Sequence, residues 1–189
     1  MIVDALFQPF SLAILFIVAS MVVTAAGWMR RGARDDAELE GGLKVLRRLG
    51  GALGANHPVR KRLESGPVTE LSLEELAQLL VGKEGNAAAN GLLALEHRLN
   101  WMERFAQLST YLGILGTVLG LVLSNPNDLV LFRQKLTLGL GSTFYGLVGA
   151  LIISVVTGSA EQIILKARQR MRMALIESFE KVEPSPTGG

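Results

Sequence analysis

The chain has 189 residues, of which 49% are apolar and 19% charged, and its mean hydropathy of +0.36 is too high for an ordinary soluble domain. Its 19 basic and 17 acidic residues leave a net charge of only +2, which argues against nucleic-acid binding through overall basicity. The absence of cysteine excludes disulfides, thiol catalysis and cysteine-ligated zinc sites.

Three segments contain no Asp, Glu, Lys or Arg, and each is long enough to cross a membrane as a helix. They run over residues 5–29, 105–127 and 136–160, which are 25, 23 and 25 residues long. A helix needs about 20 apolar residues to cross about 30 Å of hydrocarbon. The first segment is not typical of a removable signal peptide, because no basic residue precedes it. We therefore expect an all-α membrane protein with three transmembrane helices.

The basic residues beside these segments predict their orientation. On one side of the membrane the segments are flanked by Arg30, Arg31, Arg34, Arg98, Arg104, Lys166, Arg168, Arg170 and Arg172. The connection between the second and third segments holds only Arg133 and Lys135. Because basic residues favour the cytoplasmic side, the N-terminus is expected outside and the C-terminus in the cytoplasm.

This orientation divides the chain into six parts. They are an outer N-terminus with the first transmembrane helix (1–29), a cytoplasmic helical region (30–104), the second transmembrane helix (105–127), an outer link (128–135), the third transmembrane helix (136–160), and a cytoplasmic helix and tail (161–189).

Both later spans are expected to continue as long helices on the cytoplasmic side. Apolar residues recur every three or four positions from about Ala88 into the second span, and again from Ile164 into the tail. Within the cytoplasmic region, Ser72 and Glu75 have the spacing of a capping box and predict a further helix start.

Small residues line one face of each of the last two spans. On the second span they are Ser109, Gly113, Gly116 and Gly120, and on the third, at four-residue spacing, Ser142, Gly146, Ala150, Ser154 and Gly158. Such faces let helix backbones approach closely, so we assign these residues to helix packing. Packing within a single chain would explain them as well as packing between copies.

Two threonines are predicted to lie at the same depth. Thr117 lies seven residues before Ser124 at the end of the second span, and Thr143 lies seven residues after Leu136 at the start of the third. At 1.5 Å per residue both hydroxyls are roughly 10 Å below the outer surface. A pair of hydroxyls can line a polar route while remaining neutral. Alternatively, each hydroxyl only bonds to the carbonyl one turn earlier, as threonine in a helix readily does.

The same two spans carry a family resemblance. The runs YLGILGTVLGLVLS at 111–124 and LGLGSTFYGLVGALI at 138–152 resemble the MotA/TolQ/ExbB family of ion-channel subunits in energy-transducing bacterial motors. The layout is closest to the three-span TolQ/ExbB branch. Leu138 stands where those relatives usually carry a glutamate. The process driven therefore stays open between import, envelope tethering, gliding and flagellar rotation.

The resemblance implies a ring of five copies in the bacterial inner membrane, around two copies of a single-span partner of the MotB/TolR/ExbD type. Thr117 and Thr143 then match the threonines that line the ring. Because the three spans contain no titratable Asp, Glu, His, Lys or Arg, any proton-binding group must come from the partner, which in this family carries an Asp. The function implied is an ion-conducting subunit that couples proton or sodium motive force to motion of the partner inside the pore.

The alternative is a non-conducting scaffold subunit, in which the small-residue faces only pack helices. An enzyme is not expected, because no metal-ligand spacing, nucleophile motif or phosphate-binding loop is present. The two histidines, His57 and His97, fall in the cytoplasmic region, where solvated surface is their expected role. We therefore expect no metal, no cofactor and no nucleic-acid partner, and the lipid bilayer as surroundings.

Overall fold

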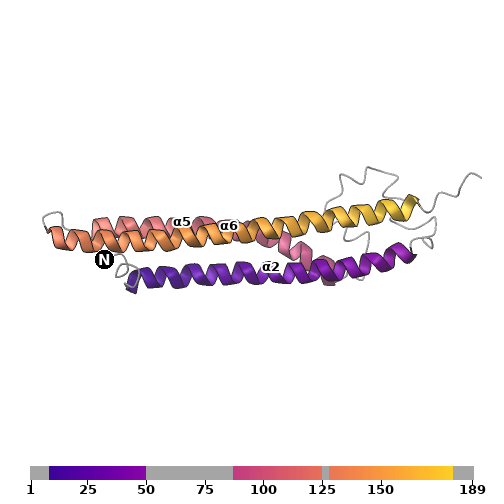
Figure 1. Ribbon diagram of the computed structural model, residues 1–189, viewed down its shortest axis with the longest axis horizontal. Coiled ribbons are helices and arrows are strands. Elements are labelled where there is room, and N and C mark those ends of the chain that lie inside the picture. Colours follow the sequence, from indigo (N-terminus) through magenta and orange to yellow (C-terminus); the bar gives the residue numbers. More distant parts are fainter. Residues whose placement is uncertain (1–8, 50–86, 125–127, 181–189) are drawn as a thin grey trace, which may run out of the picture. The chain divides into compact units, whose positions relative to one another are not determined.

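The computed structural model describes residues 9–49, 87–124 and 128–180, and these form three long helices (Figure 1). They are α2 (Pro9–Leu49, 41 residues), α5 (Ala87–Val122, 36 residues) and α6 (Leu129–Glu180, 52 residues). The described residues contain no strand. Each helix is long and apolar enough to cross a membrane. The predicted all-α membrane protein with three spanning helices is confirmed.

All three helices continue past their charge-free segments without a break. α5 begins at Ala87 and α6 runs to Glu180, as the apolar periodicity predicted. α2 continues to Leu49 through the paired glycines Gly41 and Gly42, which are tolerated inside a long helix. The helix start predicted at Ser72 and Glu75 lies outside the described residues.

α6 begins earlier in the sequence than the charge-free segment. The Asp128 carboxylate accepts hydrogen bonds from the backbone N–H groups of Val130 and Leu131, at 3.0 and 3.1 Å. This is an N-cap, which satisfies amide donors that the helix itself leaves unpaired. Most of the segment expected as an outer link, residues 128–135, therefore forms the first two turns of α6.

The chain forms two compact units, which we describe separately. The first unit comprises residues 1–29 and 98–159, and so contains most of the three charge-free segments. Inside it the backbones of α5 and α6 approach closely. A Cβ atom added to Gly146 would lie 2.6 Å from the Ser109 carbonyl oxygen and 2.7 Å from the Gly113 Cα atom. α2 packs on this pair through Ile14, which lies against Gly116, and through Val18.

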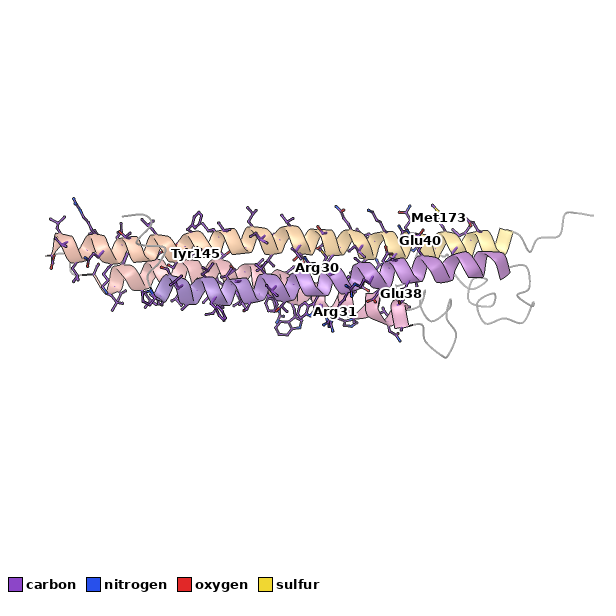
Figure 2. The ribbon with its side chains drawn as sticks, turned by 60° about the horizontal axis from the view of Figure 1, so that its bottom comes forward. Arg30, Arg31, Glu38, Glu40, Tyr145 and Met173 are labelled. Carbon is purple, nitrogen blue, oxygen red and sulfur yellow. The ribbon has the colours of Figure 1, made fainter. Side chains whose placement is uncertain are left out.

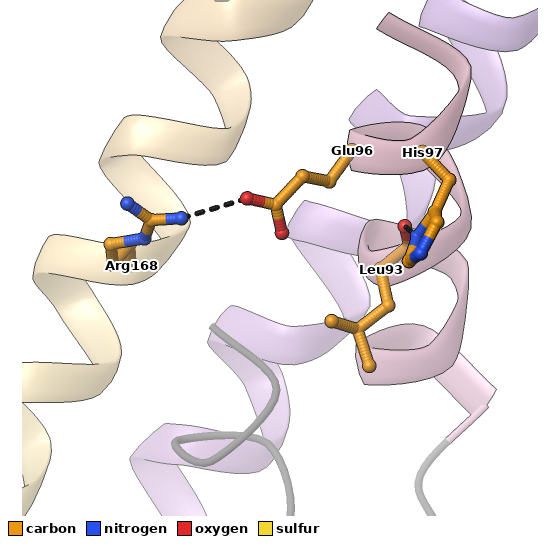
Figure 3. A network of polar contacts seen from close by, with 4 residues as sticks. All are labelled: Leu93, Glu96, His97 and Arg168. Carbon is orange, nitrogen blue, oxygen red and sulfur yellow. Dashed lines mark hydrogen bonds and ion pairs between the residues drawn. The ribbon is translucent and has the colours of Figure 1, made fainter. Parts of the chain in front are cut away.

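The second unit comprises residues 30–97 and 160–189. Its described part combines apolar packing with ion pairs between helices. The buried side chains are Leu39, Ala88, Ala89, Leu92, Leu95, Ala160, Ile164, Ala167, Met171 and Ala174. Arg168 on α6 donates to Glu96 on α5 at 2.8 Å, and Figure 3 shows the two side chains facing each other. Arg170 bonds Asp36 at 3.0 Å and Glu40 at 3.3 Å, both on α2.

Much of the surface of the spanning helices is not covered by the chain itself. Only 22% of the most apolar window of α2, 22% of that of α5 and 33% of that of α6 is buried. Side chains project outward along all three helices (Figure 2). In water such a surface would be unstable, so it must contact lipid or other membrane helices.

Because α5 and α6 approach closely at Gly146, we predict that even a methyl side chain at this position lowers the stability of the protein. Gly146→Ala should lower the stability of the purified protein by about 1–3 kcal/mol, because the new methyl group meets rigid backbone rather than movable side-chain atoms. The midpoint of thermal unfolding in detergent measures this. Gly158→Ala on the same helix is the matched control, since nothing lies within 4 Å of its added Cβ. Equal midpoints for the two variants would contradict the prediction.

Candidate functional site

The candidate site is a cluster of hydroxyl and carbonyl oxygens between α5 and α6. The side-chain oxygens of Thr117 on α5 and Thr143 on α6 are in direct hydrogen-bond contact. Both side chains are partly buried. The structure therefore brings together the two threonines that the sequence placed at one depth.

Each threonine also reaches the carbonyl oxygens of two glycines. Thr117 Oγ1 lies 3.4 Å from the Gly113 carbonyl oxygen on its own helix and 3.2 Å from that of Gly139 on α6. Thr143 Oγ1 lies 3.1 Å from the Gly139 carbonyl oxygen and 3.0 Å from that of Gly113. The back-bonding and the cross-helix pairing weighed from the sequence are thus both present. We call these four residues the threonine–glycine cluster.

The two glycines of the cluster make the cross-helix bonds possible. Each stands four residues before its threonine, so its carbonyl oxygen points toward that hydroxyl along the helix. A Cβ atom at Gly139 would lie 2.8 Å from Thr117 Cα, and one at Gly113 would lie 3.2 Å from Thr143 Cα. Any larger residue would push the helices apart and separate the hydroxyls.

The hydrogen-bond inventory of the cluster decides what it can bind. Each hydroxyl has one hydrogen and two lone pairs, and each carbonyl oxygen only accepts. The cluster therefore has two hydrogens for four oxygens, and more acceptor positions than donors. A further donor, such as water, hydronium or a protonated carboxyl group, can hydrogen-bond to it without any charged side chain in the membrane.

Further small residues hold the same pair of helices together. The buried Ser109 hydroxyl on α5 donates to the Gly146 carbonyl oxygen on α6 at 2.8 Å, and Ser142 is buried against Gly116. A Cβ atom at Gly120 would lie 2.6 Å from the Lys135 carbonyl oxygen. These contacts extend the close approach of α5 and α6 on both sides of the two threonines.

The contact face of α6 differs from the strict four-residue spacing of the sequence pattern. Ala150 is only partly buried, and Ser154 is exposed and bonds the Ala150 carbonyl oxygen of its own helix at 2.9 Å. With 3.6 residues per turn, each four-residue step turns about 40° away from the starting face. The buried face alternates three- and four-residue steps instead, through Gly139, Ser142, Gly146, Gly149 and Ile153.

Sequence reasoning missed Gly139 and Gly149. Gly139 precedes Thr143 by four residues, as Gly113 precedes Thr117, and this repeated Gly-to-Thr spacing is the signal that could have identified it. A Cβ atom at Gly149 would lie 1.9 Å from Val18 Cγ1 and 2.8 Å from Ser109 Oγ, so Gly149 is where α2 meets the α5–α6 pair.

No ionisable residue lies within the cluster. The charge-free segments that contain it hold no Asp, Glu, Lys, Arg or His. Across the part of the chain that the structure describes, no group of three or more His, Cys, Asp or Glu could hold a metal ion. The site can pass or orient a proton, but among its own side chains it has no group that binds one at neutral pH.

The region that carries the cluster matches a known protein family. Residues 84–174 match the model of the MotA/TolQ/ExbB proton channel family. This range includes all of α5 and α6 up to Ala174, and therefore both threonines and both glycines of the cluster. Neither the search of curated proteins nor the search of solved structures gave a match. Through residues 84–174, a little under half of its length, the chain is similar to the MotA/TolQ/ExbB proton channel family.

Proposed function

We propose that this chain is the ion-conducting subunit of a bacterial inner-membrane motor. In this proposal it couples a proton or sodium motive force to the motion of a single-span partner dimer inside its pore. The observation that carries the proposal is the contact between the hydroxyls of Thr117 and Thr143, in spans that have no charge of their own. The match of residues 84–174 to the model of a proton channel family supports it.

The threonine–glycine cluster supports conduction because it is polar but neutral. A charged side chain in the middle of the membrane is costly unless it is paired or hydrated. Oxygens that already hydrogen-bond one another avoid most of this cost and can still accept a bond from a passing donor. The cluster thus suits a position where a proton-carrying group docks, releases its proton and moves on.

The proton-carrying group is proposed to come from the partner. Members of this family work with partners of the MotB/TolR/ExbD type. Here the partner would supply an Asp on its single membrane helix. When neutral, this carboxyl can donate to the surplus acceptors of the cluster, and when ionised it can accept from the hydroxyls of Thr117 and Thr143.

The proposed assembly is a ring of five copies around two partner helices. The uncovered apolar surface of the spanning helices supports association with other membrane helices. The arginines that flank the spans support an orientation with the N-terminus in the periplasm and the C-terminus in the cytoplasm. In this orientation the threonine–glycine cluster lies nearer the periplasmic surface, where protons enter.

A non-conducting scaffold is the second candidate. The bond from Ser109 to Gly146, and the glycine contacts around it, pack helices tightly whether or not anything flows. The two functions differ in what they require of the threonine hydroxyls. A scaffold needs only the shape of Thr117 and Thr143, whereas a conduction site needs their oxygens.

Replacing either threonine by valine should therefore strongly slow transduction while leaving assembly intact. Valine keeps the shape of threonine and removes the hydroxyl. A hydrogen bond to a charged group is worth about 1.5–3 kcal/mol, so Thr117→Val or Thr143→Val should lower the transduction rate on the order of 10- to 100-fold. Transduction is measured as motility or uptake, and assembly as the yield of the purified complex.

Two control variants make this test specific. Thr117→Ser should retain most of the activity, because serine keeps the oxygen. Thr157→Val should be close to neutral, because among the described residues the Thr157 hydroxyl bonds only the Ile153 carbonyl oxygen of its own helix. Full activity in both cluster valine variants would show that the hydroxyls are packing groups and would favour the scaffold.

The proposed stoichiometry is tested separately. Mass spectrometry of the intact complex, extracted together with its partner, should give five copies of this chain and two of the partner. Five copies are expected because the resemblance to the MotA/TolQ/ExbB family implies a ring of this size around the partner helices. A monomer or a compact dimer of this chain would contradict the ring.

A further inference from the structure

Both tryptophans of the chain lie in the first unit, at the end of the spans away from the threonine–glycine cluster. Trp28 on α2 stacks against Phe105 on α5, with ring centroids 5.8 Å apart and planes at 23°. The guanidinium carbon of Arg98 lies 5.4 Å from the centroid of the Trp28 ring. Trp28 is therefore held from two sides, and it fixes the position of one arginine.

A second arginine, six residues and nearly two turns further along α5, is held in the same way. The guanidinium carbon of Arg104 lies 5.4 Å from the centroid of Trp101, and Trp101 is 53% exposed. Arg98, Trp101 and Arg104 follow one another at three-residue spacing, so they form a continuous ridge on the helix surface. We call Trp28, Arg98, Trp101 and Arg104 the tryptophan–arginine cluster.

Among the residues that the structure describes, these two arginines have no carboxylate partner, unlike Arg168 and Arg170 of the second unit. Among the described residues no ion pair joins Arg98 or Arg104 to Asp or Glu, and the neighbouring Glu103 is exposed and pairs with neither. Arg168 and Arg170, by contrast, are each paired with carboxylates. Within the described residues, the positive charge of Arg98 and Arg104 is thus not neutralised by a carboxylate.

The depth of the cluster identifies where that anion would lie. Thr117 is 13 residues after Arg104 on α5, or about 20 Å along the helix, and is itself roughly 10 Å from the outer end of the span. The sum is about the 30 Å thickness of the hydrocarbon layer, so Arg104 lies at its inner boundary. Arg98 lies about 9 Å further toward the cytoplasm along α5. The two arginines therefore span the headgroup layer, which is roughly 5–7 Å thick.

We propose that the tryptophan–arginine cluster binds the phosphate of an anionic phospholipid in the inner leaflet. A guanidinium fork matches the geometry of a phosphate, and stacking on a tryptophan face leaves its N–H groups free to donate. Tryptophan rings are themselves favoured at this depth. The proposal does not depend on ion conduction.

The tryptophans provide a direct test, because no others exist in the chain to contribute fluorescence. The purified protein is reconstituted in vesicles of phosphatidylcholine and phosphatidylglycerol, with brominated chains on one lipid or the other to quench nearby tryptophans. At equal mole fraction, brominated phosphatidylglycerol should quench more strongly. From an attraction of about 1 kcal/mol per arginine, its relative binding constant should exceed that of phosphatidylcholine roughly fivefold for each arginine.

Variants then assign the preference to the cluster. Arg98→Gln with Arg104→Gln keeps both tryptophans and should abolish most of the preference for phosphatidylglycerol. Arg133→Gln with Lys135→Gln removes the same charge at the outer end of the first unit and should leave the preference unchanged. Inorganic phosphate in solution should not reverse the quenching, because the ligand is the membrane lipid.

Three outcomes would overturn the proposal. The first is equal quenching of the wild-type protein by both lipids, and the second is an unchanged lipid preference in the Arg98 and Arg104 double variant. The third is an equal loss of the lipid preference in the Arg133 and Lys135 double variant. If the double variant does not assemble, the salt dependence of the lipid preference of the wild-type protein tests the proposal. Its preference must fall as salt is raised, and a preference insensitive to salt would contradict binding through arginine. Loss of ion transport would leave this result unaffected.

Discussion

The approach of two helix backbones at Gly113 and Gly139 is the constraint on which the rest of the first unit depends. Without side chains at these positions, α5 and α6 come close enough for each threonine hydroxyl to reach the carbonyl oxygen of the opposite helix, at 3.0 and 3.2 Å. At a larger separation, Thr117 and Thr143 would bond only within their own helices. The glycines thus convert two ordinary helical threonines into one shared polar site.

The second constraint is the distribution of charge. The spans carry none, whereas in the second unit ion pairs such as Arg170 with Asp36 and Glu40 link the helices in addition to their apolar packing. These pairs are partly exposed and individually contribute little to stability, but they join helices that are far apart in sequence. In our proposal, the neutral site between the spans binds a proton carrier that belongs to another polypeptide.

Much of the fold could be predicted from the sequence. Segment length and missing charge predicted the three helices, and the apolar periodicity predicted the long continuations of α5 and α6, because both follow directly from the properties of hydrocarbon and of helix geometry. The equal depth of Thr117 and Thr143 was also predicted, by counting residues from the outer end of each span. The helical start of α6 at Leu129 was not, because Arg133 and Lys135 put the start of the charge-free segment at Leu136, whereas the cap at Asp128 starts the helix earlier.

The details of the site required three-dimensional structure. A strict four-residue repeat predicted that Ser154 lies on the packing face of α6. Ser154 is exposed, whereas Gly139 and Gly149, which this repeat leaves out, make close contacts. A repeat of four residues exceeds the 3.6 residues of a helical turn by about 0.4 residue. This difference moves the predicted face little over one turn but far over three. The pairing of Arg170 with Asp36, across 134 positions, depends on how the helices pack and has no local signal in the sequence.

The central claim is that this chain forms a neutral passage whose titratable acid belongs to a second polypeptide. Proton flux into vesicles with an imposed pH gradient tests it most directly. Vesicles that contain this chain alone should leak no faster than empty ones, and flux should appear only when the single-span partner is reconstituted with it. Rapid flux through the chain alone would contradict the account.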